Sequence, residues 1–135
     1  MNKNNTDDQL IQSAKDYQKN STAKYSQFKV GAALLDKDGN IHGGCNVESS
    51  SYGLTICAER VALTKALSEG IYDFIKIAIV GPNNEFCSPC GACRQLLHDY
   101  APDLEIILTD NTEIKSLKLK DLLPFAFEEK NLKKT

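Results

Sequence analysis

The apolar residues near the start of the chain recur at intervals of three and four. They are Leu10, Ile11, Ala14 and Tyr17. This spacing places them on one side of a helix and predicts a helix over residues 7–20. The next apolar run, residues 28–35, is nearly continuous and predicts a buried strand. A turn sequence at residues 38–40 then predicts that residues 41–47 return as the hairpin partner of that strand.

The rest of the chain alternates between helical and strand patterns after a polar loop at residues 48–55. The predicted elements are a helix over 57–68 closed by Gly70, a strand over 74–80, a helix over 91–100, a buried strand over 104–108 and an edge strand over 114–119. An irregular tail is predicted from Leu122, with a loose polar end over 129–135. The order of elements predicts an α/β fold, a three-layer α/β/α sandwich with a five-stranded mixed sheet.

Composition limits the classes of function that suit the chain. Its 135 residues, 41% hydrophobic and 25% charged, fit a single domain over residues 1–135 with a core that needs no disulfides. A net charge of −2 and a pI of about 5.7 offer no general attraction to polyanions, so no nucleic acid polymer is expected as a partner. Residues 1–9 lack the apolar stretch of a signal peptide, and no apolar run approaches the ~20 residues of a membrane span. A cytoplasmic location without membrane association is therefore expected.

Three cysteines in two segments predict a metal site. Five cysteines in a reducing compartment favour metal binding or catalysis over disulfides. Cys90 and Cys93 lie three positions apart at the start of a predicted helix, and Cys57 lies at the start of another. Three protein ligands with one open position are typical of a catalytic zinc, whereas a structural zinc has four. One Zn²⁺ per chain is therefore expected, held by these three thiolates.

Glu59 is the candidate proton-transfer group beside this metal. Two residues that are two positions apart on a regular helix point in nearly opposite directions. Glu59 and Cys57 can both reach the metal only if Cys57 lies at the entry of the helix, outside the regular turn. With that geometry, Glu59 can accept the proton of a metal-activated water and pass it on. Zinc nucleobase deaminases have a His- or Cys-x-Glu segment followed by Pro-Cys-x-x-Cys. Cys57-Ala-Glu59 and Pro89-Cys90-Gly-Ala-Cys93 match that pattern.

The pattern leaves less specific interpretations open. A structural zinc with Cys87 as fourth ligand is the alternative for the cysteines, and a zinc-stabilised interaction module without enzymatic activity is the corresponding alternative function. A structural site does not need Glu59, which favours catalysis. Arg60 and Arg94 stand next to the ligand segments, and one or both are expected to donate to the thiolates. Cys45 and Cys87 are expected to be small, partly buried residues, and His42 and His98 ordinary histidines.

A longer set of segments carries a resemblance to a known family. They are Tyr25-Ser-Gln-Phe28-Lys-Val-Gly31-Ala-Ala, Gly44-Cys-Asn46-Val-Glu48, Tyr52-Gly-Leu-Thr-Ile-Cys57-Ala-Glu59-Arg60, Pro89-Cys90-Gly-Ala-Cys93-Arg94-Gln95 and Leu122-Leu-Pro124. On these segments, and over nearly its whole length, the sequence resembles the small homotetrameric cytidine deaminases. The resemblance implies hydrolytic deamination of cytidine and deoxycytidine to the uridine products, with release of ammonia, by a zinc-activated water and a glutamate proton shuttle.

The resemblance also implies roles for individual residues. Asn46 and Glu48 hold the ribose hydroxyls, and Phe28 packs on the pyrimidine. From the pattern alone, Asn46 and Glu48 would be solvent-exposed residues at the end of a hairpin, and Phe28 would be a core aromatic residue. Phe127, near the C-terminus, reaches the site of a neighbouring subunit, so that sites are shared within a homotetramer.

The remaining positions matched by the resemblance lie close to these. They are Ala58 and Tyr52 beside the substrate, and Arg60, Arg94 and Gln95 around the metal ligands. The sequence departs from the family at Ser49-Ser50, where Asn-Ala is common, at Lys24, where proline is usual, and at Phe125, where glycine is common. Deaminases of a nucleoside antibiotic such as blasticidin S share the zinc motif, and a polynucleotide editor is a second alternative with the same chemistry. Asn46, Glu48 and Phe28 favour cytidine over the antibiotic, and the low pI disfavours a polynucleotide.

Overall fold

The computed structural model of the protein describes residues 3–132. A five-stranded sheet with the order β2-β1-β3-β4-β5 forms its centre. The strands are β1 (Gly31–Asp36), β2 (Ile41–Cys45), β3 (Phe74–Val80), β4 (Glu105–Thr109) and β5 (Ile114–Lys118). The β3 and β4 pair is parallel, and the other three neighbouring pairs are antiparallel. The mixed five-stranded sheet predicted from the sequence is therefore confirmed.

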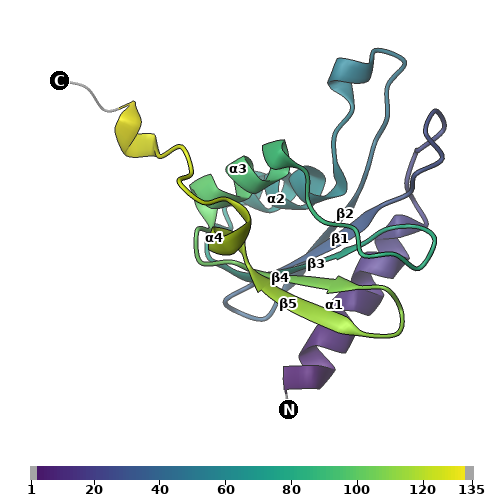
Figure 1. Ribbon diagram of the computed structural model, residues 1–135, viewed down its shortest axis with the longest axis horizontal. Helices are drawn as coiled ribbons and strands as arrows, with labels where there is room; N and C mark the ends of the chain where they lie inside the picture. The colour runs from purple at the N-terminus through teal and green to yellow at the C-terminus, as the bar shows by residue number, and fades with distance from the viewer. Residues whose placement is uncertain (1–2, 133–135) are drawn as a thin grey trace.

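Helices cover both faces of this sheet. They are α1 (Lys3–Gln18), α2 (Ala58–Ser68), α3 (Gly91–Tyr100) and the single turn α4 (Leu119–Leu122), with short 3₁₀ segments η1 (Tyr52–Leu54) and η2 (Glu129–Asn131). Figure 1 shows α1 on one face and α2 with α3 on the other, which confirms the three-layer α/β/α arrangement. Within residues 3–132, no helix combines the length and the apolar character that a membrane crossing requires.

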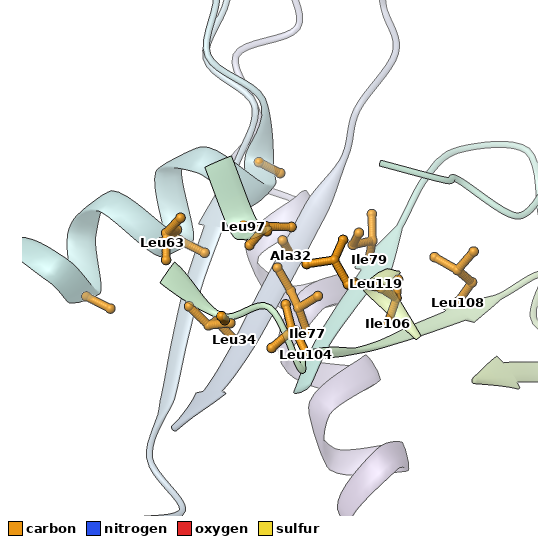
Figure 2. Close-up of a cluster of buried hydrophobic side chains, with 14 of the residues drawn as sticks. Ala32, Leu34, Leu63, Ile77, Ile79, Leu97, Leu104, Ile106, Leu108 and Leu119 are labelled. Atoms are coloured by element: carbon orange, nitrogen blue, oxygen red, sulfur yellow. The ribbon is translucent and has the colours of Figure 1, made fainter. Parts of the chain in front are cut away.

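The central strands bury side chains on both faces. Alternate residues of a strand point to opposite faces of the sheet, so each strand contributes to two cores. The larger core, towards α2 and α3, includes Leu34, Ile77, Leu97 and Ile106 (Figure 2). The smaller core packs α1 against the other face through Leu10, Ile11, Ala14, Ala33, Leu35, Ala78, Val80 and Ile107. Burial on both faces explains why these strands are continuous apolar runs in the sequence.

Several element boundaries differ from the sequence-based expectation. The first helix begins at Lys3 and not at residue 7, because an additional polar turn extends it without an apolar signal. The first strand begins at Gly31 and not at residue 28, because the N–H of Val30 donates to the Asn46 side chain in place of a strand ladder. The chain also forms α4 between the predicted edge strand over 114–119 and the tail predicted from Leu122, so that the strand ends at Lys118 and Leu119 lies fully buried at the start of the helical turn.

The loose polar end predicted over residues 129–135 stays a prediction. Residues 129–131 form η2, a short 3₁₀ segment. Residues 133–135 lie outside the described part of the chain. In Figure 1 the segment that carries η2 extends away from the sheet and its helices.

A close contact between β2 and α2 sets the position of the second helix. Gly44 lies so near this helix that a Cβ atom there would be 2.6 Å from the Ala62 nitrogen and 2.8 Å from the Ala58 oxygen. Such distances exclude any side chain unless the backbone moves. The first turn of α2, which follows Cys57, is thereby held directly against the sheet.

Candidate active site

Two of the three candidate ligands occupy the caps of helices. Cys57 is the N-cap of α2 and Cys90 is the N-cap of α3, and both have extended backbone dihedral angles. Each thiol therefore precedes the regular turns of its helix, as the sequence argument requires if Cys57 and Glu59 are to face the same site. Cys93 follows in the first turn of α3 and is fully buried. The N-termini of two helices, which are the positive ends of their dipoles, thus lie beside the thiol group.

The three sulfurs form a group of suitable size for zinc. The Sγ atoms of Cys57, Cys90 and Cys93 all lie within 4.8 Å of one another, and those of Cys57 and Cys90 are 3.8 Å apart. Sulfurs placed tetrahedrally at ~2.3 Å from one ion are separated by ~3.8 Å. Thiolates are also the soft ligands that zinc accepts readily. Among the described residues Cys87 is not part of this group, so the structure gives no support to a closed four-cysteine site.

The pKa values of the thiols indicate which protons a bound metal ion would displace. The pKa of Cys57 is lowered to about 5, first because the Cys93 thiol donates to its sulfur and then because Arg60 does so. The pKa of Cys93 is raised for the complementary reason, since its proton is shared with the Cys57 thiolate, and burial adds to the effect. A metal ion at this position must therefore displace at least one thiol proton as it binds.

The two arginines beside the ligands have different partners. Arg60 Nη2 lies 3.7 Å from Cys57 Sγ and 3.4 Å from the Thr55 carbonyl oxygen, so it donates to the thiolate. Arg94 donates at 2.8 Å to the Pro89 carbonyl oxygen, the Ser88 hydroxyl and the Leu122 carbonyl oxygen. Arg94 therefore fixes the segment before Cys90 and ties it to α4. The sequence did not distinguish these two contacts.

Glu59 is almost completely buried, with 4% of its surface exposed. Burial raises the pKa of its carboxyl to about 7, and the negative charge of the Cys57 thiolate adds to this shift. A carboxyl group that titrates near neutral pH can both accept and return a proton under physiological conditions. The geometry therefore places a suitable acid–base group beside the thiol cluster.

A cavity of about 210 Å³ connects the cluster to the outside. Its lining consists of Ser26, Phe28, Val30, Asn46, Glu48, Thr55, Cys57, Ala58, Glu59, Cys87, Ser88 and Cys90. Four of the expected substrate-contact residues, Phe28, Asn46, Glu48 and Ala58, thus share one cavity with the catalytic candidate and two ligands. The sequence did not assign five lining residues to this cavity: Ser26, Val30, Thr55, Cys87 and Ser88. Ser26, Val30 and Thr55 do lie within matched segments and Ser88 lies next to one, and that position was the only available signal.

Asn46 and Glu48 also organise the cavity wall. The Asn46 amide nitrogen donates to the Phe28 carbonyl oxygen at 2.8 Å, and its oxygen accepts from the Val30 N–H at 3.0 Å. Glu48 Oε1 accepts from the backbone N–H groups of Tyr25 and Ser26, each at 3.0 Å. The Ser26 hydroxyl donates to the other oxygen of the same carboxylate, and these contacts lower the pKa of Glu48. Both residues therefore hold the loop that carries Phe28.

Tyr52, Phe127 and Gln95 do not line the cavity within this chain. Tyr52 is 78% exposed in η1, and its ring meets that of Tyr25 edge to face at 6.4 Å. Phe127 is half-exposed in the C-terminal segment, and its carbonyl oxygen accepts from Gln95 Nε2 at 3.0 Å. A larger hollow of about 920 Å³ beside Phe127 does not include any of the three ligands or Glu59. Gln95 therefore fixes the tail, and the substrate roles of Tyr52 and Phe127 stay predictions.

Each histidine has a carboxylate partner. His42 Nε2 lies 2.9 Å from the Asp36 carboxylate, and His98 Nε2 lies 3.2 Å from the Glu128 carboxylate. Neither histidine belongs to the metal-binding group found among residues 3–132. Cys87 is partly buried, and burial raises its pKa to about 11, so it is a neutral thiol at the cavity wall.

Comparison with known proteins places this arrangement in a family. Residues 4–108 match the family model described as the cytidine and deoxycytidylate deaminase zinc-binding region. A cytidine deaminase of Halalkalibacterium halodurans is 45% identical over 120 residues, which cover 87% of this chain and 91% of that protein. A blasticidin-S deaminase of Bacillus cereus is 33% identical over 110 residues, which cover 76% and 79% of the two chains.

Solved structures agree with the sequence comparison. The crystal structure of cytidine deaminase from Burkholderia pseudomallei superposes with a TM-score of 0.85 at 44% identity, covering 94% of this chain and all of that one. That of the cytidine deaminase from Mycobacterium tuberculosis gives a TM-score of 0.79 at 37% identity, with 89% and 95% covered. The family model, the relatives and the thiol group together confirm zinc as the cofactor expected from the sequence. The chain belongs to the cytidine and deoxycytidylate deaminase family of zinc-dependent enzymes.

Proposed function

We propose that the protein hydrolyses cytidine and deoxycytidine to uridine and deoxyuridine and releases ammonia, as in pyrimidine salvage. The observation that supports this most directly is the shared cavity, whose lining includes Glu59 and two of the three thiols together with Phe28, Asn46 and Glu48. The same cavity thus combines groups for water activation and proton transfer with an aromatic ring and polar groups suited to a nucleoside. A cavity of about 210 Å³ is smaller than the ~300–1,000 Å³ of drug-sized sites and suits a small substrate.

Cys57, Cys90 and Cys93 would hold the zinc, and Arg60 offsets part of their negative charge through its contact with Cys57. When bound, zinc supplies a water whose pKa falls from 15.7 towards ~7, so that a strong nucleophile exists at neutral pH. Glu59 is the residue placed to take a proton from that water and deliver protons to ring nitrogen N3 and to the departing amino group. Water adds at C4, the bond from C4 to the amino nitrogen breaks, and ammonia leaves with the proton that Glu59 returns.

Asn46 and Glu48 are proposed to contact the ribose hydroxyls, with Phe28 against the pyrimidine ring. The Glu48 carboxylate accepts hydrogen bonds from Tyr25 and Ser26, and its fixed orientation suits recognition of a hydroxyl donor. Binding energy from a remote part of a substrate helps to position the reacting part. The sugar contacts are therefore expected to affect turnover as well as affinity.

Ammonia release from cytidine by the purified, zinc-loaded protein tests the proposed function. We expect rapid release from cytidine and deoxycytidine, and much slower release from free cytosine, which lacks the sugar. Blasticidin S belongs in the same assay because a relative at 33% identity is a blasticidin-S deaminase. Equal kcat/KM for cytosine and cytidine would contradict the roles given to Asn46 and Glu48. Faster turnover of blasticidin S than of cytidine would overturn the proposed substrate.

A cytoplasmic location is proposed on chemical grounds. The three thiols of the metal group must stay reduced to bind zinc, and thiols persist in the reducing environment of the cytoplasm.

A further inference from the structure

The loop before β1 carries a proposed substrate contact but has little burial of its own. Residues 24–29 are all exposed, and Phe28 within them lines the cavity. Gln27 has a φ of 63°, in the left-handed region that residues with a side chain rarely adopt. An exposed loop with an unfavourable backbone angle depends on specific contacts to keep one conformation.

Ser26 makes several of these contacts. Its N–H donates to Glu48 Oε1 at 3.0 Å, and its hydroxyl donates to Glu48 Oε2. The same hydroxyl oxygen accepts from the N–H of Phe28 at 3.0 Å. A serine hydroxyl has one hydrogen to donate and lone pairs to accept with, and here Ser26 uses both functions.

We propose that Ser26 is a positioning residue whose hydroxyl couples the Glu48 carboxylate to the backbone of Phe28. The inference rests on the proposed function, in which Glu48 contacts the sugar and Phe28 contacts the ring. The carboxylate cannot rotate towards solvent without releasing the hydroxyl, and the Phe28 backbone cannot move without the same loss. Ser26 thereby holds the sugar contact and the ring contact in one relative geometry.

This role predicts a specific kinetic signature. Removing the hydroxyl leaves Cys57, Glu59 and Cys90 untouched, so zinc content and the chemical step should change little. The loop and the carboxylate should then sample other conformations. Substrate binding must order them again, which weakens the affinity. Ser26→Ala is expected to raise KM for cytidine about tenfold, corresponding to loss of one hydrogen bond to a charged group, and to lower kcat by less than about threefold.

Two variants separate positioning from a general effect on the fold. Ser26→Thr keeps a hydroxyl at the same place and should restore most of the affinity. Ser51→Ala is the matched control. Ser51 is also an exposed serine, it precedes η1, and its side chain makes no capping hydrogen bond there. It should behave like the unmodified protein.

A double-mutant cycle with Glu48→Ala tests whether Ser26 acts through Glu48. If it does, Ser26→Ala should raise KM much less in the Glu48→Ala variant than in the unmodified protein, because residues in contact give non-additive effects. Thermal unfolding and zinc content are measured for every variant, so that a folding defect is visible.

The outcomes distinguish this inference from the proposed function. A zinc-loaded, unmodified protein without activity on cytidine overturns the proposed function itself. An active unmodified protein with Ser26→Ala equal to Ser51→Ala in KM overturns only the role of Ser26. Additive effects of Ser26→Ala and Glu48→Ala, or a loss confined to kcat, also overturn it.

Discussion

Four consecutive residues at the start of α2 carry much of the site. Cys57 precedes the first turn as the helix cap, Ala58 lines the cavity, Glu59 enters it from within the turn, and Arg60 reaches back to the Cys57 sulfur. The change from extended to helical backbone at Cys57 lets residues two positions apart reach the same cavity. Burial of Glu59 and proximity of the thiolate then raise its pKa, so one local conformation provides both a ligand and a proton carrier.

Glu59→Gln separates catalysis from metal binding. Glutamine keeps the size of the side chain but cannot accept the proton, and general acid–base assistance is typically worth ~10²–10⁴ in rate. We expect kcat to fall by at least a factor of about 10², with zinc content and fold retained. Steady-state kinetics and metal analysis measure this, with Cys90→Ala as the contrasting variant that should lose zinc. If Glu59→Gln keeps more than about a tenth of the activity, its assigned role is wrong.

The thiol group predicts how zinc affinity depends on pH. Cys57, with a pKa of about 5, already lacks a proton at neutral pH, whereas the raised pKa of Cys93 means that this thiol keeps one. The metal-free protein therefore binds more protons than the zinc-bound form, and affinity should fall as pH falls. Competition with a chelating dye between pH 8 and pH 6 should show a decrease of about tenfold or more per pH unit. An affinity that does not change over this interval would contradict thiolate ligation.

At the scale of elements, the sequence predicted which helices and strands exist better than it predicted where they begin and end. The helix predicted over residues 57–68 is observed as Ala58–Ser68, because its apolar spacing and its Gly70 stop signal are both clear. The early start of α1 was missed because its first turn is polar, and α4 was missed because a single turn has too few residues to show a period.

The candidate site was predictable to the extent that it follows local spacing. The ligands and Glu59 are identified by residue type and by their distance along the chain. Arg60 donates to Cys57, only three positions before it, whereas Arg94 donates to Leu122, 28 positions further along, and a contact between distant segments leaves no local pattern. The same reason applies to Ser26, whose contact with Glu48 joins residues 22 positions apart.

Gly44→Ala tests whether the packing of β2 against α2 holds the site in place. An added Cβ would meet the backbone of Ala58 and Ala62 at distances below 3 Å, so α2 must shift away from the sheet. Overpacking of this kind typically costs ~1–3 kcal/mol, and the shift also moves Cys57 and Glu59. We expect a lower melting temperature together with weaker zinc binding and reduced kcat. Gly53→Ala is the control, since a Cβ there has no neighbour within 4 Å. A Gly44→Ala protein with normal stability and zinc affinity would contradict this account.

At the scale of the whole molecule, the two faces of the central sheet have different roles. The α1 face is a closed apolar core, and the opposite face carries the two helices whose N-termini form the metal group. The C-terminal segment belongs to neither core. It carries Phe125, which is fully exposed, and Phe127, which is 53% exposed, and Figure 1 shows it extending away from the other elements. Two exposed aromatic residues on such a segment indicate that another protein surface covers them.

The assembly prediction follows from this segment. A second copy of the chain would cover the exposed aromatic residues, and the family resemblance implies a homotetramer in which Phe127 reaches a neighbouring site. Light scattering at micromolar concentration should therefore give about four chains per particle, a common closed assembly of identical subunits. Phe127→Ala should lower kcat/KM for cytidine by about tenfold, because loss of an aromatic substrate contact costs ~1–3 kcal/mol. Leu132→Ala, at another exposed apolar residue of the same tail, is the control. A fully active monomer would show that each site is complete within one chain, and the role of Phe127 would then be wrong.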